Sequence, residues 1–288
     1  MSASSEDGFL SNNERMMSPG IGRVPTMNSI RKDVYQEAME LTALLKRQGI
    51  GFKLLGGMAF KMICVSSSNG PFARTPVDID MIIHRKDASA VSSLLKERGY
   101  SPRERFNALY GAKRLIFNDV DNGRRIDVFI DTFEMCHSFD FSSRIDREGV
   151  ALSPADLLLT KLQIVQTSGR DYKDILSVLA DFRVFNEDRD DAIDVNRISD
   201  ICAEDWGIYR TVTDNLKKLL STLDTFGIET GMRGSIVSAI ETLLSGIEGR
   251  KKSLQWKMRS RVGTRVRWYV LPEEDREVVQ SSVDERKQ

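Results

Sequence analysis

Aspartates alternate with apolar residues in two short segments of the sequence. The first segment, residues 77–83, carries Asp78 and Asp80, and the second, residues 125–131, carries Asp127 and Asp131. Side chains two apart on a strand share a face, so Asp78 and Asp80 would point the same way. Neighbouring carboxylates repel one another unless a cation lies between them. Mg²⁺, a hard ion that prefers oxygen ligands, is the natural counter-charge.

The second segment predicts a third carboxylate for the same site. If its strand lies beside the first, Asp127 joins Asp78 and Asp80, and the three could hold one or two Mg²⁺ ions. Two-ion sites stabilise the attacking and leaving oxygens of an in-line phosphoryl displacement. Asp131 shares a face with Asp127 and is the alternative third acid. We prefer Asp127 because it lies deeper in the apolar run.

A pair of glycines precedes the first acidic segment. Gly56 and Gly57 follow an apolar strand expected over Phe52–Leu55 and open a helix. Glycines let the backbone approach a phosphate closely, and a helix N-terminus favours an anion. The pair therefore predicts a phosphate-binding loop, although a plain tight turn is the simpler interpretation.

The elements that would position these residues suggest an α+β fold, in which a mixed sheet is flanked by helices. Helical spacing covers residues 28–48, 58–65 and 87–98, and strands are expected at 77–84, 112–118 and 124–130. Asp121-Asn122-Gly123 joins the last two strands and is a strong hairpin signal. From Ser153 the pattern is helical, with an N-cap followed by proline.

This pattern divides the chain into five parts. We expect a flexible tail over 1–26, a core over 27–150 and helices that complete the core over 151–186. A helical C-terminal region follows over 187–270, with a polar tail over 271–288.

The order of these motifs resembles the nucleotidyltransferase superfamily of the DNA polymerase β type. Its minimal or AbiEii-like members show Gly-Gly-x-Ala and then Arg-x-x-x-Asp-Ile-Asp, as do residues 56–59 and 74–80 here. The resemblance covers roughly residues 28–185. It implies Mg²⁺-dependent transfer of a nucleoside monophosphate from an NTP, such as ATP, with release of pyrophosphate. Asp78, Asp80 and Asp127 would then be both the metal ligands and the catalytic residues.

The resemblance also implies roles for basic residues that would otherwise be unremarkable. Arg74 and Lys161 would contact the triphosphate, together with Gly56 and Gly57. Lys173-Asp174 resembles a lysine-aspartate pair of the family, although an ion pair on the helix surface is the simpler interpretation. Two departures stand out: the gap between the glycines and Asp78 is long, and Ser177 replaces a further acid.

Composition is that of an ordinary globular protein. The chain has 288 residues, 29% of them charged, and a formal net charge of zero. No apolar run reaches the ~18 residues that span a bilayer. Three widely spaced cysteines argue against a disulfide framework. We therefore expect a cytoplasmic protein with no membrane partner.

Residues 250–267 form a basic segment near the C-terminus. It holds eight lysines and arginines, no acids, and Trp256, with Trp268 directly after it. Cations interleaved with aromatic residues can bind nucleic acid. A solvated or packed helix is the preferred interpretation, because acidic stretches at 186–194 and 273–276 could neutralise the segment.

Two classes of function stay open at this point. The first is an enzyme whose acceptor is RNA, protein or a small molecule. The second is a non-catalytic binding or regulatory module of the same fold, such as a toxin–antitoxin partner. Retention of all three acids favours the enzyme.

Overall fold

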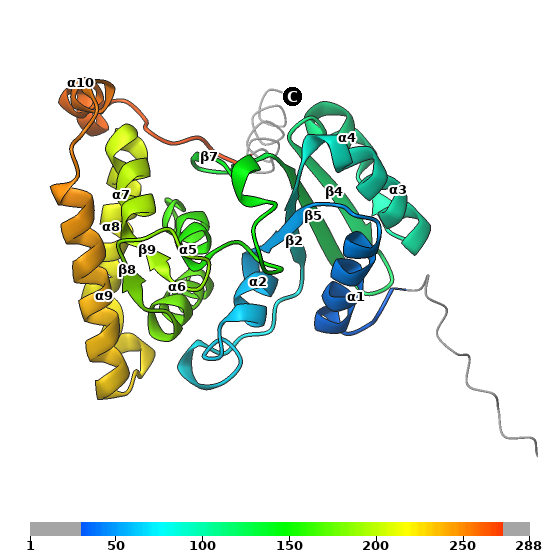
Figure 1. Cartoon of the computed structure of the whole chain (residues 1–288), viewed down its shortest axis with the longest axis horizontal. Coiled ribbons are helices and arrows are strands. Elements are labelled where there is room, and N and C mark those ends of the chain that lie inside the picture. The colour runs from blue at the N-terminus through cyan, green and yellow to red at the C-terminus, as the bar shows by residue number, and fades with distance from the viewer. Residues whose placement is uncertain (1–29, 273–288) are drawn as a thin grey trace, which may run out of the picture.

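A computed structural model describes residues 30–272 of the chain, so the expected tail at 1–26 and all but the first two residues of the expected tail at 271–288 lie outside the described residues. Within the described part, a mixed sheet is flanked by helices and followed by a helical C-terminal region (Figure 1). This confirms the α+β expectation. The elements, in chain order, are α1 (Val34–Arg47), β1 (Phe52–Leu55), α2 (Gly56–Ile63), β2 (Ile79–Ile83), α3 (Ala88–Arg98), β3 (Ser101–Pro102), α4 (Glu104–Tyr110), β4 (Arg114–Asp119), β5 (Arg124–Ile130), β6 (Thr132–Glu134), β7 (Ser138–Asp140), α5 (Pro154–Leu162), α6 (Gly169–Asp181), β8 (Val184–Phe185), β9 (Ile193–Asp194), α7 (Val195–Glu204), α8 (Trp206–Thr222), α9 (Thr230–Gly249) and α10 (Leu254–Val262).

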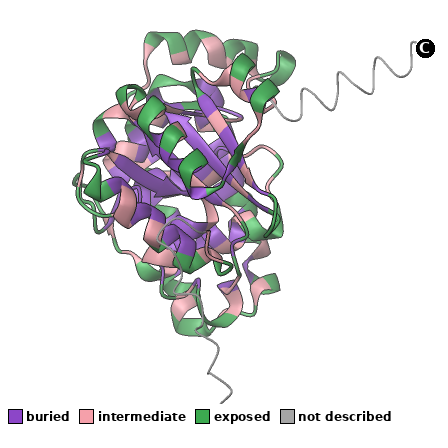
Figure 2. Ribbon diagram, turned by 90° about the vertical axis from the view of Figure 1, so that its right-hand side faces the viewer, coloured by how far each residue is buried: buried purple, intermediate pink, exposed green. Residues whose placement is uncertain are grey.

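The main sheet has the strand order β1-β2-β5-β4-β3, and the short β6–β7 hairpin extends from β5. β2 and β5 run parallel, whereas β1–β2, β4–β5 and β3–β4 are antiparallel. The sheet is buried between helices (Figure 2). Burial on both faces explains the continuous apolar run Val128–Ile130 in β5, since such strands cannot expose one polar face to water.

Helix starts follow local capping chemistry. Asp33 caps α1 by accepting a hydrogen bond from the Gln36 N–H, so this helix begins at Val34 and not at residue 28 as expected. Ser153 caps α5 through the Asp156 N–H, with Pro154 in the first turn. Side-chain caps of this kind satisfy backbone donors that have no partner within the helix.

The segment before α5 fixes that helix against the sheet. Leu54 donates its N–H to Val150 at 2.8 Å, and the Leu152 N–H donates to Leu54 at 3.0 Å. Residues 150–152 therefore run along the edge of β1, and α5 begins directly beyond it. This edge contact brings Lys161, late in α5, toward the start of α2.

The C-terminal region returns to the sheet. After α10 the chain runs back toward the β6–β7 hairpin (Figure 1), where the Val270 N–H donates to the carbonyl of Cys136 at 3.0 Å. Among the helices of residues 30–272, none combines the length and the apolar character needed to cross a membrane.

Candidate active site

Asp80 and Asp127 lie side by side on the two parallel strands at the centre of the sheet. They are register partners in the β2–β5 pair, so their side chains leave the same face. Asp127 is buried and Asp80 is half-buried. Burial and the adjacent Asp127 carboxylate raise the pKa of Asp80 above its usual range.

Two arginines hold the Asp127 carboxylate. Arg114, from the neighbouring strand β4, contacts Oδ1 through Nε at 3.0 Å and Nη2 at 2.9 Å. Arg125, two residues before Asp127 on β5, contacts Oδ2 at 2.9 Å. Both carboxylate oxygens therefore face a cation, and such pairing offsets part of the cost of burying a charged group.

Asp78 and Asp131 lie at opposite ends of the strand pair. Asp78 precedes β2 by one residue, and its Oδ1 accepts the Arg125 N–H at 2.9 Å, so it lies next to the Asp127 strand. Asp131 follows β5 in a left-handed conformation, with φ of 58°, and its Oδ1 accepts the Arg85 N–H at 3.1 Å. Asp127 is thus the acid beside Asp80, whereas Asp131 belongs to the far end of the sheet.

The glycine pair lies directly against the acidic and basic side chains of the site. Leu55 is the register partner of Asp80, so Gly56 begins α2 next to the Asp80 carboxylate. A Cβ at Gly56 would lie 1.8 Å from Asp80 Oδ2. A Cβ at Gly57 would lie 2.5 Å from Nη2 of Arg74. Only glycine leaves room for both side chains at this helix start.

Arg74 and Lys161 converge on Asp174, a buried residue of α6. Arg74 binds Asp174 with two hydrogen bonds, Nε to Oδ1 and Nη2 to Oδ2, each of 2.6 Å. Lys161 Nζ lies 2.9 Å from Asp171 Oδ1 and 3.0 Å from Asp174 Oδ2. Burial disfavours the lysine ammonium, but Asp174 and Asp171 outweigh this effect and raise the pKa of Lys161. The site therefore keeps two charged cations beside the glycine pair.

The expectation of a surface ion pair at Asp174 is wrong. Its side chain is 2% exposed and binds a residue from a distant part of the chain. Helical periodicity shows that α6 has a buried face but not which partner meets it. The sequence motifs likewise gave no signal for Arg114, because only the β4–β5 register brings it to Asp127. Arg125 could have been found, since it shares a strand face with Asp127.

The structure thus gathers five of the expected site residues: Gly56, Gly57, Arg74, Asp80 and Lys161. Asp127 lies next to Asp80 on β5, and Asp78 lies directly before β2. The carboxylates suit Mg²⁺ chemically, because they are oxygen ligands with excess negative charge. However, within residues 30–272 there is no group of three or more acid, histidine or cysteine side chains arranged to hold a metal ion. A third ligand from Asp127 requires Arg125, whose side chain is 35% exposed, to release Oδ2.

The two histidines lie outside this site. His84 follows β2, with Nε2 3.0 Å from Asp146 Oδ2. His137 lies between β6 and β7, where its Nε2 is 2.8 Å from Thr211 Oγ1. Burial lowers the pKa of His137 to about 4. Both rings thus have partners of their own, Asp146 for His84 and Thr211 for His137.

A mixed sheet with adjacent acids on its central strands, next to a glycine pair at a helix start, defines a nucleotidyltransferase-type protein. Residues 30–216 match a family described as "Uncharacterised nucleotidyltransferase", and the chain belongs to this family. A search of curated proteins found no match. The structure is similar to an antigenic nucleotidyltransferase-like protein from Paracoccidioides brasiliensis, with a TM-score of 0.42 and 15% identity, over 78% of this chain and 96% of that one.

Proposed function

We propose that this protein is a Mg²⁺-dependent enzyme that transfers a nucleoside monophosphate from an NTP to an acceptor and releases pyrophosphate. The observation that carries the proposal is the pairing of Asp80 with Asp127 on adjacent parallel strands, directly against Gly56. Family membership supports nucleotidyl transfer in general. Mg²⁺ and the acceptor are parts of the proposal.

In this proposal the acids of the site bind Mg²⁺, and the start of α2 binds the phosphates. Asp78 and Asp80 would hold Mg²⁺, and Asp127 would complete its ligands once Arg125 releases one oxygen. Bound Mg²⁺ would stabilise the charge that develops on the attacking and leaving oxygens. A second Mg²⁺ ion at the same site is a further expectation. The α2 N-terminus at Gly56-Gly57 would receive the phosphates through backbone N–H groups.

Arg74 and Lys161 would neutralise the triphosphate. Both are held close to the glycine pair by Asp174 before any nucleotide binds. Prior positioning of this kind lowers the entropy cost of binding. In the reaction, the acceptor oxygen forms a bond to the α-phosphorus as the bond to the pyrophosphate oxygen breaks, and the acceptor proton passes to water.

Label transfer tests this proposal. The protein is incubated with Mg²⁺ and each NTP labelled at the α-phosphate, in the presence of total RNA, protein or small molecules. We expect label to enter one acceptor class with the wild type and not with Asp80→Asn. No transfer from any NTP, together with no NTP binding, would contradict the proposal.

A second candidate function is a non-catalytic binding module of the same fold. The observation that favours it is the double pairing of Asp127 with Arg114 and Arg125, which neutralises the third acid without metal. The module predicts NTP binding that is indifferent to Mg²⁺. The enzyme predicts binding that Mg²⁺ strengthens in the wild type but not in Asp80→Asn, which calorimetric titration would distinguish.

A further inference from the structure

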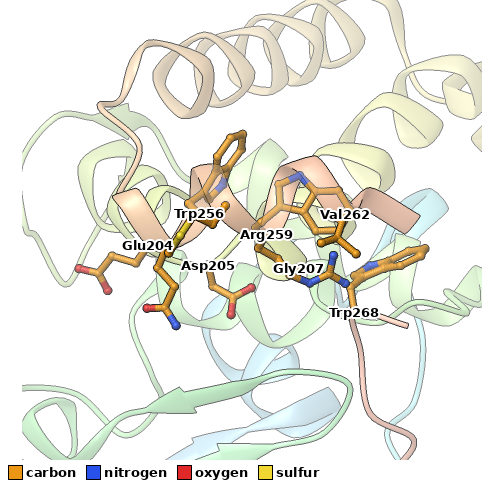
Figure 3. A pocket seen from close by; sticks show the side chains of 10 residues that line it. Glu204, Asp205, Gly207, Trp256, Arg259, Val262 and Trp268 are labelled. Carbon is orange, nitrogen blue, oxygen red and sulfur yellow. The ribbon is translucent and has the colours of Figure 1, made fainter. Parts of the chain in front are cut away.

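A pocket lies away from the acidic site, at the junction of α7, α8, α10 and the returning C-terminal segment (Figure 3). Its volume is about 530 Å³. Figure 1 shows α10 well separated from α2, which begins with the glycine pair. The side chains that the argument uses are mainly aromatic or basic: Trp206, Trp256, Met258, Arg259, Val262 and Trp268.

The pocket has a rigid stacking surface. The Arg259 guanidinium lies over the Trp206 ring, 4.8 Å from its centroid. Its two terminal nitrogens donate to the carbonyls of Gly263 at 2.7 Å and Val266 at 2.8 Å, which fix the plane of the group. Trp206 meets Trp268 edge to face at 6.2 Å. Guanidinium planes and indoles are surfaces on which unpaired bases stack.

Trp268 is anchored as well as packed. Its Nε1 donates to Thr211 Oγ1 at 3.0 Å, so this indole is held to α8 rather than turning freely. A base entering the pocket would therefore meet side chains that already have fixed orientations. Rigid aromatic contacts of this kind cost little conformational entropy on binding.

Exposed cations lie on α10 and in the segments that flank it. Lys251, Lys257, Arg261 and Arg265 are exposed, and within residues 30–272 none of them forms a salt bridge. By contrast, Arg250 of the same basic segment pairs with Asp200. The segment 250–267 contains no acid of its own. The four exposed cations therefore give α10 and its flanking segments a net positive charge, although none of them lines the pocket itself.

Residues 186–194 were expected to neutralise this segment, and of their acids Asp194 does attract Arg250, whereas Asp188 and Asp190 bind other arginines. Asp188 pairs with Arg144 and Arg147, and Asp190 pairs with Arg147. The second acidic stretch, 273–276, lies outside the described residues. Two acids do line the pocket, Glu204 and Asp205. Asp205 is engaged as the cap of α8, because its Oδ1 accepts the Ile208 N–H at 2.9 Å.

We propose that this pocket binds a base of a single-stranded nucleic acid, with the adjoining phosphates along Lys257 and Arg261. We take the bound strand to be the acceptor of the transfer reaction, and in this respect the inference rests on the proposed function. The distance of the pocket from the acidic site suits a polymer, whose reacting end and binding segment lie apart. An anionic membrane is the competing ligand, because Leu254 and Met258 are also exposed on α10. The concave aromatic surface favours nucleic acid, since a bilayer meets protruding side chains.

Binding without NTP tests the inference separately from catalysis. The full chain is titrated into fluorescein-labelled 12-nucleotide RNA and DNA single strands, each also made in an abasic form. Lys257→Glu/Arg261→Glu should weaken all four probes about tenfold or more and flatten the salt dependence by roughly one to two units. Lys96→Glu/Lys217→Glu makes the same charge change at exposed lysines elsewhere and should leave binding near the wild-type level.

Arg259→Lys separates stacking from charge, because lysine keeps the cation but loses the planar group. It should weaken the base-containing strands about tenfold and the abasic strands hardly at all. Equal binding by wild type, Lys257→Glu/Arg261→Glu and Lys96→Glu/Lys217→Glu would overturn the inference. Binding to phosphatidylserine vesicles but not to either nucleic acid would overturn it in favour of a membrane surface.

NTP binding and melting temperature are measured on every variant. If a variant unfolds, the single changes Lys257→Gln and Arg261→Gln replace it. Failure of nucleic-acid binding with intact Mg²⁺-dependent NTP binding would leave the proposed function standing. Loss of NTP binding in the wild type itself would remove the proposed function instead.

Discussion

Gly56 and the Asp80 carboxylate are in such close contact that no other residue type fits between them. Gly56 has φ of +63°, and a Cβ at this position would lie 1.8 Å from Asp80 Oδ2. The turn from β1 into α2 and the position of the central acid are therefore determined together. A change at either residue must move the other.

Gly56→Ala should abolish transfer while a matched glycine change does not. The alanine must displace Asp80, and a misplacement of about 1 Å at a reacting centre costs about a hundredfold in rate. Gly123→Ala is the control, because Gly123 has the same φ of +63° but nothing within 4 Å of its Cβ. The control should lose about 1–2 kcal/mol of stability from backbone strain alone and keep its transfer rate. Similar transfer rates in the two variants would show that the contact is unimportant.

In metal-free buffer, Asp80→Asn should lose less stability than the wild type as the pH rises. Burial and Asp127 raise the pKa of Asp80 in the folded state, so the folded protein holds this proton more tightly than the unfolded chain. The wild type consequently loses stability as the pH rises from about 4 through the folded-state pKa. Asparagine has no proton to lose, and its melting temperature should fall less across this window.

Mg²⁺ supplies the complementary measurement on the same two proteins. A ligand that binds only the folded state raises its melting temperature. We expect Mg²⁺ to raise the melting temperature of the wild type and to have little effect on Asp80→Asn. Equal responses would argue against a metal site at Asp80.

The alternation of acids with apolar residues was sufficient to predict the two strands that carry Asp80 and Asp127. These strands are β2 and β5, and in their parallel pairing the two aspartates are register partners. Asp121-Asn122-Gly123 correctly predicted the β4–β5 hairpin, where Gly123 has the positive φ that such turns require. These are local signals, and they are the ones that sequence periodicity can carry.

Contacts between distant segments could not be read from the sequence. Arg74 meets Asp174 across 100 residues, and neither position has a periodicity that names its partner. The short helix α4, seven residues long, also has too few turns to show a clear apolar face. The basic C-terminal segment was predicted as a packed or solvated helix, whereas its contacts with Trp206 depend on how α8 and α10 are arranged.

Breaking the Arg74–Asp174 pair should cost more than breaking a similar pair at the surface. Asp174→Asn leaves Arg74 and Lys161 without their shared buried carboxylate, and loss of one partner of a buried pair costs about 3 kcal/mol. The KM for NTP should rise as well, because Arg74 loses its buried anchor and Lys161 keeps only Asp171. Asp191→Asn is the control: Asp191 also binds an arginine, Arg189, with two hydrogen bonds, but both side chains are exposed.

Denaturant unfolding and NTP kinetics check this pair of variants. The surface change should have little effect on stability, because water and salt screen an exposed pair, and it should leave the KM unchanged. If the two substitutions had equal effects on stability, Asp174 would not be the buried anchor described here.

His137 should make the folded protein sensitive to acid. The ring is 8% exposed, and burial lowers its pKa from 6.5 to about 4. Between these values the unfolded chain binds a proton that the folded chain does not, so stability falls as the pH drops from about 6.5 to about 4. The loss should approach about 3 kcal/mol at the lower limit.

His137→Gln should remove this loss of stability at low pH, whereas His84→Gln, at the only other histidine of the sequence, should retain it. Chemical unfolding at pH 7, 6, 5 and 4 provides the measurement, with acids elsewhere contributing equally to all three proteins. Because Thr211 bonds both His137 and Trp268, the tryptophan fluorescence of the folded protein should change near pH 4, where His137 takes up its proton, in wild type and His84→Gln. Parallel stability curves for wild type and His137→Gln would mean that His137 titrates normally in the folded chain.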